Sequence, residues 1–174
     1  MPEYRIRSLK ATEFESANKA LTDVLIDCVE GGASVSFMHP LARDKATAFW
    51  LNVGQSVERG ERTVIVAEDG EGKIIGTVQL ITSQPENQPH RADVAKLLVH
   101  SSARRRGVAQ RLMAYLEAVA TTQGKSVLVL DTATGSDAET FYQNMGWQRV
   151  GDLPFYALMP DGSPCSTTFY YRHL

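Results

Sequence analysis

The chain has 174 residues, of which 43% are hydrophobic and 22% are charged, so its length and composition predict one domain, residues 1–174, with a continuous core. Its 18 basic and 20 acidic residues give a net charge of −2, and this balance argues against nucleic acid as the main partner. No apolar stretch has the length of a membrane span or the form of a secretion signal, so neither a membrane partner nor secretion is expected.

The first third of the chain predicts a strand followed by two helices. Residues 4–9 alternate in polarity like a short strand, and Thr12 and Glu15 have the spacing of a capping box, which predicts a helix start. The apolar face of this helix repeats at helical spacing and consists of Phe14, Ala17, Leu21, Val24, Leu25 and Cys28. Two glycines end the helix at the start of the loop GGASVSFMHP (31–40), and a second helix is expected over about 41–60.

The rest of the chain predicts strands interrupted by two further helices. In chain order the expected elements are a hairpin of strands 63–68 and 73–83, strand 92–100, helix 105–123, strand 126–131, helix 136–145 and strands near 147–151 and 166–173. The order β-α-α-β-β-β-α-β-α-β-β indicates an α/β fold. We expect a mixed, mostly antiparallel sheet of six to seven strands, flanked on both faces by about four helices.

A basic turn, RRRGVA at residues 104–109, joins a predicted strand to a predicted helix. The first backbone N–H groups of a helix lack partners and carry the positive end of its dipole, so they attract anions. Gly107 and Ala109 leave room for a ligand against this backbone. The Gly-Lys-Ser/Thr of a P-loop and the fingerprint G-x-G-x-x-G are both absent. The turn therefore predicts a pyrophosphate site of another kind, with a solvated basic turn as the alternative.

This turn resembles motif A of the GCN5-related N-acetyltransferases, in which Arg/Gln-x-x-Gly-x-Gly/Ala binds acetyl-CoA. The element order and the later segment FYQNMGW are also similar to that family, whose fold is of the α+β type. The resemblance implies acetyl-CoA as cosubstrate and no metal ion. It implies that the pantetheine arm pairs with the backbone of Leu97, Leu98 and Val99. The pyrophosphate would be held at Arg104, Arg105, Arg106, Gly107, Val108, Ala109 and Gln110.

The sequence departs from the family pattern at three positions. Ser101 stands where many members have Pro, and Arg105 stands where many have Gly, although neither change removes a backbone donor. The Asn that often precedes the last helix is Gly135 here, which puts that contact with coenzyme A in doubt.

Four longer segments are similar to acetyltransferases of the tabtoxin-resistance type, which acetylate a β-lactam toxin. These segments are GGASVSFM (31–38), RADVAKLLVHSSARRRGVA (91–109), LDTATGSDAETFY (130–142) and RVGDLPFY…PDG (149–162). This likeness implies a small-molecule amine as the acceptor and a role in toxin or antibiotic resistance.

Tyr142 stands where the family's tyrosine donates a proton to the sulfur of coenzyme A. A tyrosine hydroxyl, with a pKa of about 10, is protonated at neutral pH and suits this role. The alternative is packing, although Phe141 fits the core better.

Asp131 and Asp93 lie at strand ends and face the acceptor in the tabtoxin-resistance type, where a carboxylate deprotonates or positions an ammonium group. As alternatives, Asp131 caps the next turn through Thr132 or Thr134, and Asp93 is simply exposed to solvent. Phe37 in the loop 31–40 is expected to form an apolar wall of the acceptor site, unless the loop is a plain connector.

The leading hypothesis is an N-acetyltransferase that transfers acetyl directly to a primary amine in a ternary complex. Cys28 and Cys165 lie outside the motifs and lack the spacing of a metal or redox site, so we expect reduced thiols in a cytoplasmic protein and no acetyl-enzyme. His100 is either a base or simply a polar residue that leaves a strand. The alternatives are a protein N-terminal or lysine acetyltransferase and a non-catalytic acyl-CoA sensor. The C-terminal TTFYYRHL either pairs at a homodimer edge or completes the sheet of the monomer.

Overall fold

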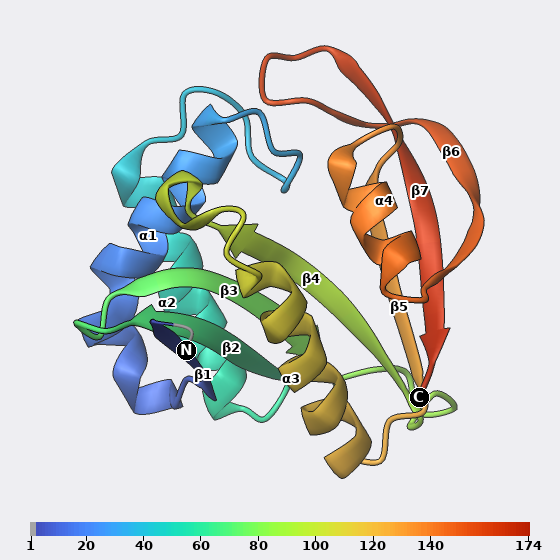
Figure 1. Cartoon of the computed structure of the whole chain (residues 1–174), viewed down its shortest axis with the longest axis horizontal. Helices are drawn as coiled ribbons and strands as arrows, with labels where there is room; N and C mark the ends of the chain where they lie inside the picture. Colours follow the sequence, from blue (N-terminus) through green and yellow to red (C-terminus); the bar gives the residue numbers. More distant parts are fainter. Residues whose placement is uncertain (1–2) are drawn as a thin grey trace.

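The computed structural model describes residues 3–174 (Figure 1). Its strands are β1 (Tyr4–Ser8), β2 (Arg62–Asp69), β3 (Ile74–Ile81), β4 (Arg91–Val99), β5 (Val127–Ala133), β6 (Gln148–Leu158) and β7 (Pro164–His173). Its α-helices are α1 (Phe14–Glu30), α2 (Arg43–Glu58), α3 (Val108–Thr122) and α4 (Asp137–Asn144), and two short 3-10 helices are η1 (Ala11–Glu13) and η2 (Ser101–Ala103). The predicted order of strands and α-helices is confirmed.

All seven strands form one sheet in the order β1-β2-β3-β4-β5-β7-β6. Every neighbouring pair is antiparallel except β4 and β5, which run parallel. The prediction of a mixed, mostly antiparallel sheet is therefore confirmed. Strand β7 lies between β5 and β6, so of the two alternatives for the C-terminal segment the structure has the one in which it completes the sheet of the monomer; the edge strand on this side is β6.

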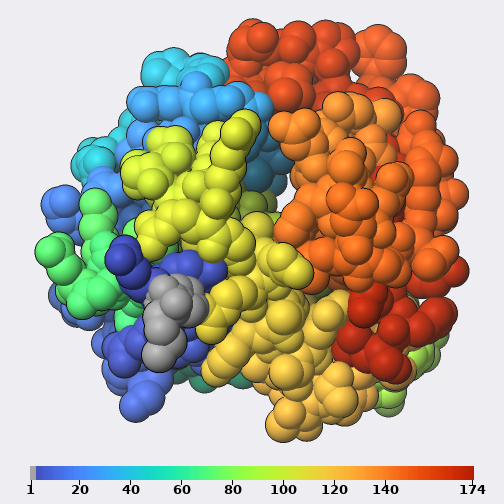
Figure 2. Space-filling model, viewed as in Figure 1, coloured from blue at the N-terminus to red at the C-terminus, as the bar shows by residue number. Residues whose placement is uncertain are grey.

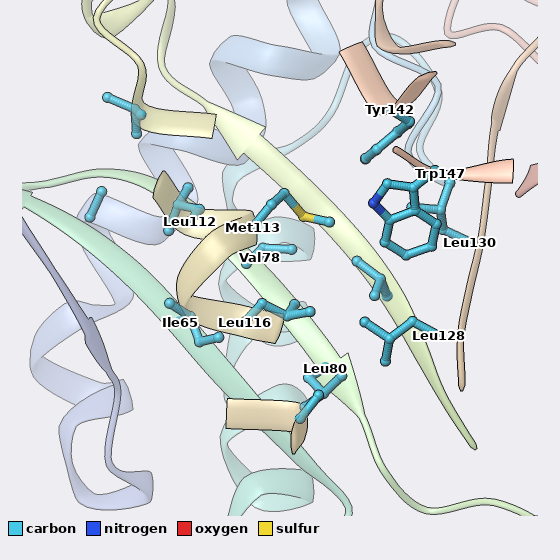
Figure 3. Packing of buried hydrophobic residues seen from close by; sticks show 14 of the residues in the cluster. Ile65, Val78, Leu80, Leu112, Met113, Leu116, Leu128, Leu130, Tyr142 and Trp147 are labelled. Atoms are coloured by element: carbon cyan, nitrogen blue, oxygen red, sulfur yellow. The ribbon is translucent and has the colours of Figure 1, made fainter. Parts of the chain in front are cut away.

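The helices pack on both faces of the sheet, as predicted. One buried cluster joins α1 and α2 to one face, and its largest fully buried side chain is Trp50. The other cluster joins α3 and α4 to the opposite face. In Figure 3, Leu112, Met113 and Leu116 of α3 point at sheet residues such as Ile65 and Leu80. Burial of these side chains provides the main driving force for folding.

The start of α1 differs from the prediction. The amide of Lys10 donates to Oε1 of Glu13 at 2.9 Å and caps η1, two residues before Thr12, and α1 begins at Phe14 directly after η1. Arg7 on β1 also donates to both carboxylate oxygens of Glu13, at 2.9 and 2.8 Å. The strand therefore holds Glu13 in the capping position, and the predicted Thr12–Glu15 capping box is wrong.

Strands β4 and β5 pair over only three residues each, Arg91–Asp93 with Val127–Val129, and then diverge. On its other side β4 carries a bulge: Ala95 faces Gln79 and Leu98 faces Thr77, so two residues of β4 oppose one of β3. The bulge includes Lys96, whose φ is +56°. The second half of β4 therefore has no strand partner on the β5 side.

Candidate functional site

A cavity of about 650 Å³ lies where β4 and β5 diverge. Its lining comes from β4, β5, α4, the α1–α2 loop and Met159 in the β6–β7 turn. Figure 2 shows the hollow at the centre of the molecule, between the α3 side and the orange C-terminal part. The amide of His39 in the α1–α2 loop donates to the carbonyl of Pro160 in the β6–β7 turn at 2.9 Å. The loop and the β6–β7 turn thus meet across one end of the hollow (Figure 1).

The basic turn forms a run of free backbone donors. Helix α3 begins at Val108, three residues later than predicted, and its first hydrogen bond joins the amide of Arg111 to the carbonyl of Gly107. Within residues 3–174, the amides of 107–110 have no acceptor. Arg105 and Gly107 have φ of +61° and +75°, and backbones with such left-handed residues form anion-binding concavities. This turn therefore fits a pyrophosphate.

Arg105 keeps the left-handed conformation that glycine adopts most easily, so the departure from the family pattern leaves this part of the turn in a glycine-like shape. The hydroxyl of Tyr4 donates to the carbonyl of Arg106 at 2.9 Å and ties the turn to β1. The guanidinium of Arg106 lies 5.6 Å from the centre of the Tyr4 ring, outside the cavity.

The remaining predicted coenzyme A contacts lie in two places. Leu97, Leu98, Val99, Arg104 and Ala109 line the cavity. The side chain of Val108 is buried in the core beneath α3, so only its amide is available to a ligand. The strand and the turn thus present one continuous surface, from the cavity to the free amides.

Tyr142 lies on α4 with its ring in the core and lines the cavity. Its ring contacts that of Trp147 at a centroid distance of 5.8 Å (Figure 3) and that of Phe141 at 5.3 Å. Its hydroxyl has no hydrogen-bond partner in the described part of the chain, and burial, aided by the charge of Asp131, raises its pKa. The hydroxyl is therefore protonated at neutral pH. Tyr142 is only 6% exposed and Phe141 is less buried, so the expectation that Phe141 fits the core better is wrong.

Asp131 lies on β5 and lines the same cavity. Its Oδ2 accepts a hydrogen bond of 2.8 Å from the hydroxyl of Thr167 on the neighbouring β7. No hydrogen bond in the described chain joins its carboxylate to Thr132 or Thr134, so it is not the turn cap considered as the alternative. Its carboxylate is exposed and free to meet a ligand.

Two predicted acceptor contacts lie elsewhere. Asp93 is in the paired half of β4, where Arg91 donates to it at 2.5 Å and Gln84 at 3.0 Å. Phe37 packs edge-on against Phe49 at 5.2 Å, beneath the α1–α2 loop. Neither residue lines the cavity, and this geometry gives no support to their predicted substrate roles. Asp93 does not line the cavity because it is one of the three residues of β4 that pair with β5, where the sheet is closed.

Sequence reasoning did not single out Lys96 and Ser36, which line the cavity. Nζ of Lys96 lies 3.1 Å from Oγ of Ser36 in the α1–α2 loop. The available signal was a single charge inside the apolar run VAKLLV. His100 instead caps η2, because its Nδ1 accepts from the amide of Ser102 at 3.1 Å, and it is outside the cavity.

Other features of residues 3–174 bear on the site. No group of three or more His, Cys, Asp or Glu side chains in this range could hold a metal ion. No helix in it is long and apolar enough to cross a membrane. Cys28 and Cys165 are both buried, free thiols.

Residues 60–149, just over half of the chain, match the model of a protein family described as an acetyltransferase (GNAT) domain. The chain belongs to the GNAT acetyltransferases. It is also 34% identical to human N-acetyltransferase 8 over 89 residues, which are 50% of this chain and 39% of the human protein. The chain thus spans well under half of that relative.

Solved structures of acetyltransferases from bacteria share the fold. An N-acetyltransferase from Staphylococcus aureus Mu50 has a TM-score of 0.78 at 20% identity, with 98% of each chain covered. A putative acetyltransferase from Salmonella typhimurium, solved with acetyl-CoA, has a TM-score of 0.77 at 17% identity and covers 98% of this chain and 94% of its own. The α/β GNAT fold predicted from the sequence is confirmed.

Proposed function

We propose that residues 1–174 act as one N-acetyltransferase domain that moves acetyl from acetyl-CoA to a primary amine of a small molecule, directly, in a ternary complex. The observation that carries this proposal is one surface that joins the free amides of 107–110 to the Tyr142 hydroxyl and the Asp131 carboxylate. Membership of the GNAT family and the Salmonella structure with acetyl-CoA support acetyl-CoA as the donor.

In the proposed complex the pyrophosphate lies at the start of α3, where the helix dipole and the free amides favour negative charge. The pantetheine arm lies along Leu97, Leu98 and Val99, where β4 has no partner on its β5 side. This arrangement brings the thioester towards Tyr142, because that side chain lines the same cavity as β4.

The proposed reaction has three steps. The acceptor ammonium first loses a proton to Asp131 or to water beside it, and the neutral nitrogen then attacks the thioester carbon. Backbone N–H groups at the β4 bulge are the candidate donors to the resulting oxyanion, since a bulge leaves an amide outside the strand ladder. When the oxyanion collapses and the C–S bond breaks, the leaving thiolate takes the proton of the Tyr142 hydroxyl, and the tyrosinate regains a proton from the nitrogen, which becomes the neutral amide.

A small acceptor is favoured by the walls of the cavity. Residues 31–36 line it, and the contact of His39 with Pro160 joins the loop to the β6–β7 turn at one end. The likeness to the tabtoxin-resistance type supports a toxin or antibiotic amine, and the buried free thiols support a cytoplasmic location. A protein N-terminus or lysine as acceptor, and an acyl-CoA sensor without turnover, are the competing outcomes.

The proposal is tested in two measurements. Saturating acetyl-CoA or coenzyme A raises the melting temperature of the protein, because both bind the folded state. A screen of small amines and peptides, the β-lactam amino acid toxin included, then detects free coenzyme A with a thiol reagent. Absence of stabilisation by either ligand contradicts the proposal, and turnover with peptides alone would replace the small acceptor by a protein.

A further inference from the structure

Lys96 occupies an unusual position in β4. It lies at the bulge with a φ of +56°, a backbone conformation that residues other than glycine rarely adopt. Its side chain lines the cavity and reaches Ser36 Oγ at 3.1 Å. Burial lowers the pKa of its ammonium group, which the charge of Asp131 partly offsets. A cation that has lost part of its hydration gains most from a bound anion.

Asp131 lines the same cavity with the opposite charge. The two groups do not form an ion pair: Lys96 is held by the Ser36 hydroxyl and Asp131 by the Thr167 hydroxyl, at 2.8 Å. Each charged group therefore has a neutral hydrogen-bond partner, and both residues line the same cavity. Such a space suits a ligand that carries both signs of charge.

Lys96 also lies away from the pyrophosphate turn. At about 3.3 Å per strand residue, its Cα is about 10 Å from that of Val99, in the direction leading away from the turn. In the proposed complex the donor's arm runs along Leu97, Leu98 and Val99, so Lys96 lies beyond its reacting end. The other lining cation, Arg104, is in the turn itself. Lys96 is thus placed for the acceptor rather than the donor.

We propose that the acceptor is a small molecule bearing both a primary ammonium group and a carboxylate, with Lys96 binding the carboxylate and Asp131 the ammonium. This inference rests on the proposed function, since it specifies the acceptor of the same site. It makes Lys96 a specificity-determining residue.

The test measures binding without turnover. Protein saturated with coenzyme A is titrated in a calorimeter with the protein amino acids, β-alanine and γ-aminobutyrate, each compared with its amide and its decarboxylated amine. We expect at least one amino acid to bind about tenfold or more tightly than its amide and its decarboxylated amine, which both lack the carboxylate. Lys96→Met removes this difference while the affinity for coenzyme A stays unchanged.

Controls separate recognition from a structural role. Lys96→Arg keeps the charge and retains the preference, and Lys45→Met changes an exposed lysine on α2 without effect. Ser36→Ala removes the contact of Lys96 with the loop and also retains the preference. If Lys96→Met disturbs the bulge, Lys96→Gly, which suits a positive φ, replaces it.

The inference is overturned if no amino acid binds better than its partners, if Lys96→Met weakens all ligands or coenzyme A alike, or if Ser36→Ala matches Lys96→Met. The proposed function is judged separately, by thiol release from acetyl-CoA. A carboxylate preference without any thiol release would therefore leave the acceptor class standing and reject the transfer reaction.

Discussion

Tyr142 has the features that each of its two predicted roles, packing and proton donation, requires. Its ring is packed against Trp147 in the core, its hydroxyl has no hydrogen-bond partner in the described chain, and the residue lines the cavity. Packing fixes where the hydroxyl lies, and burial keeps it protonated by raising its pKa. A rigid, protonated hydroxyl is what proton donation to a leaving thiolate needs.

We expect Tyr142→Phe to lower kcat on the order of 100-fold, the low end for general acid catalysis, because a thiolate is already a fair leaving group. The Kd for acetyl-CoA should stay within about twofold, since the ring and its packing are retained. The measurement is initial velocity by thiol release, with affinity by calorimetry. Tyr115→Phe on α3, a core position outside the cavity, is the matched control. An unchanged kcat in Tyr142→Phe removes this residue as the acid.

Individual site residues differ in how far the sequence predicts them. Tyr142 and Asp131 follow from their motif positions, and both line the cavity. Asp93 does not line it because β4 is paired with β5 there, and sequence alone does not tell where two parallel strands separate. Lys96 was missed for a different reason. It lies at a bulge, and a bulge interrupts the alternation of residues along a strand, so it leaves no periodic signal in the sequence.

At the scale of elements, the start of α3 is the proposed binding site for the pyrophosphate of the donor. Its free amides are the first N–H groups of the helix, and they lie at 107–110 because the helix begins at Val108, directly after the left-handed residue Gly107. Sequence patterns predicted the turn and the helix, but not the helix boundary, because boundary residues are set by backbone conformation rather than by the apolar repeat. The predicted Thr12–Glu15 cap of α1 was also wrong, because Glu13 instead accepts from the amide of Lys10 and is held by Arg7 of β1.

Ala109→Glu tests the anion site. A negative charge in the first turn favours the helix itself, so folding should not suffer. The same charge repels a pyrophosphate, and like charges placed close together cost several kcal/mol, so the Kd for acetyl-CoA should rise by about tenfold or more. Calorimetric titration measures it, with Ala118→Glu on the exposed side of α3 as control. Equal affinities in the two variants would place the pyrophosphate elsewhere.

An ion-pair network fastens β1 to β2. The buried carboxylate of Glu68 accepts from Arg5 at 2.8 Å and from Arg7 at 2.6 and 2.9 Å, and these bonds hold its pKa below its usual value. Glu68→Gln should lower the free energy of unfolding at pH 7 by about 2 kcal/mol, the usual range for hydrogen bonds to a charged group. Glu71→Gln, in the exposed β2–β3 turn, should change little.

The sign of the pH dependence follows from the lowered pKa of Glu68. Its contribution is fully present above the ordinary glutamate pKa of about 4.3 and is lost as pH falls through the lower value in the folded protein. Urea unfolding of the wild type and Glu68→Gln should therefore converge in acid. A difference that stays constant from pH 7 to pH 3 would show that the carboxylate charge is not what stabilises this edge.

At the scale of the whole molecule, the sheet is divided by the point where β4 and β5 separate. Strands β1 to β4, covered by α1, α2 and α3, form one side of the cavity, and β5 to β7 with α4 form the other (Figure 1). Element order alone predicted this mixed sheet, because the connections between consecutive elements are short. The lining of the cavity depends also on the β4 bulge, and element order alone did not predict this bulge.

The joining of two halves around one cavity has a consequence for stability. Acetyl-CoA bound between them stabilises only the folded chain, so at about 100 times its Kd it should add about 2.7 kcal/mol to the free energy of unfolding. Thermal unfolding with and without the ligand measures this, and adenosine triphosphate, which lacks the pantetheine arm, serves as the control. Equal stabilisation by both ligands would mean that β4 contributes nothing to donor binding.

The central claim is direct transfer of acetyl to an amine in this cavity. The measurement that tests it most directly follows free coenzyme A and acetylated product together, in wild-type protein mixed with acetyl-CoA and the amine panel. We predict that both form in equal amounts, and only when an amine is present. Thiol release without an amine, or none with any amine above the rate without protein, would contradict the claim.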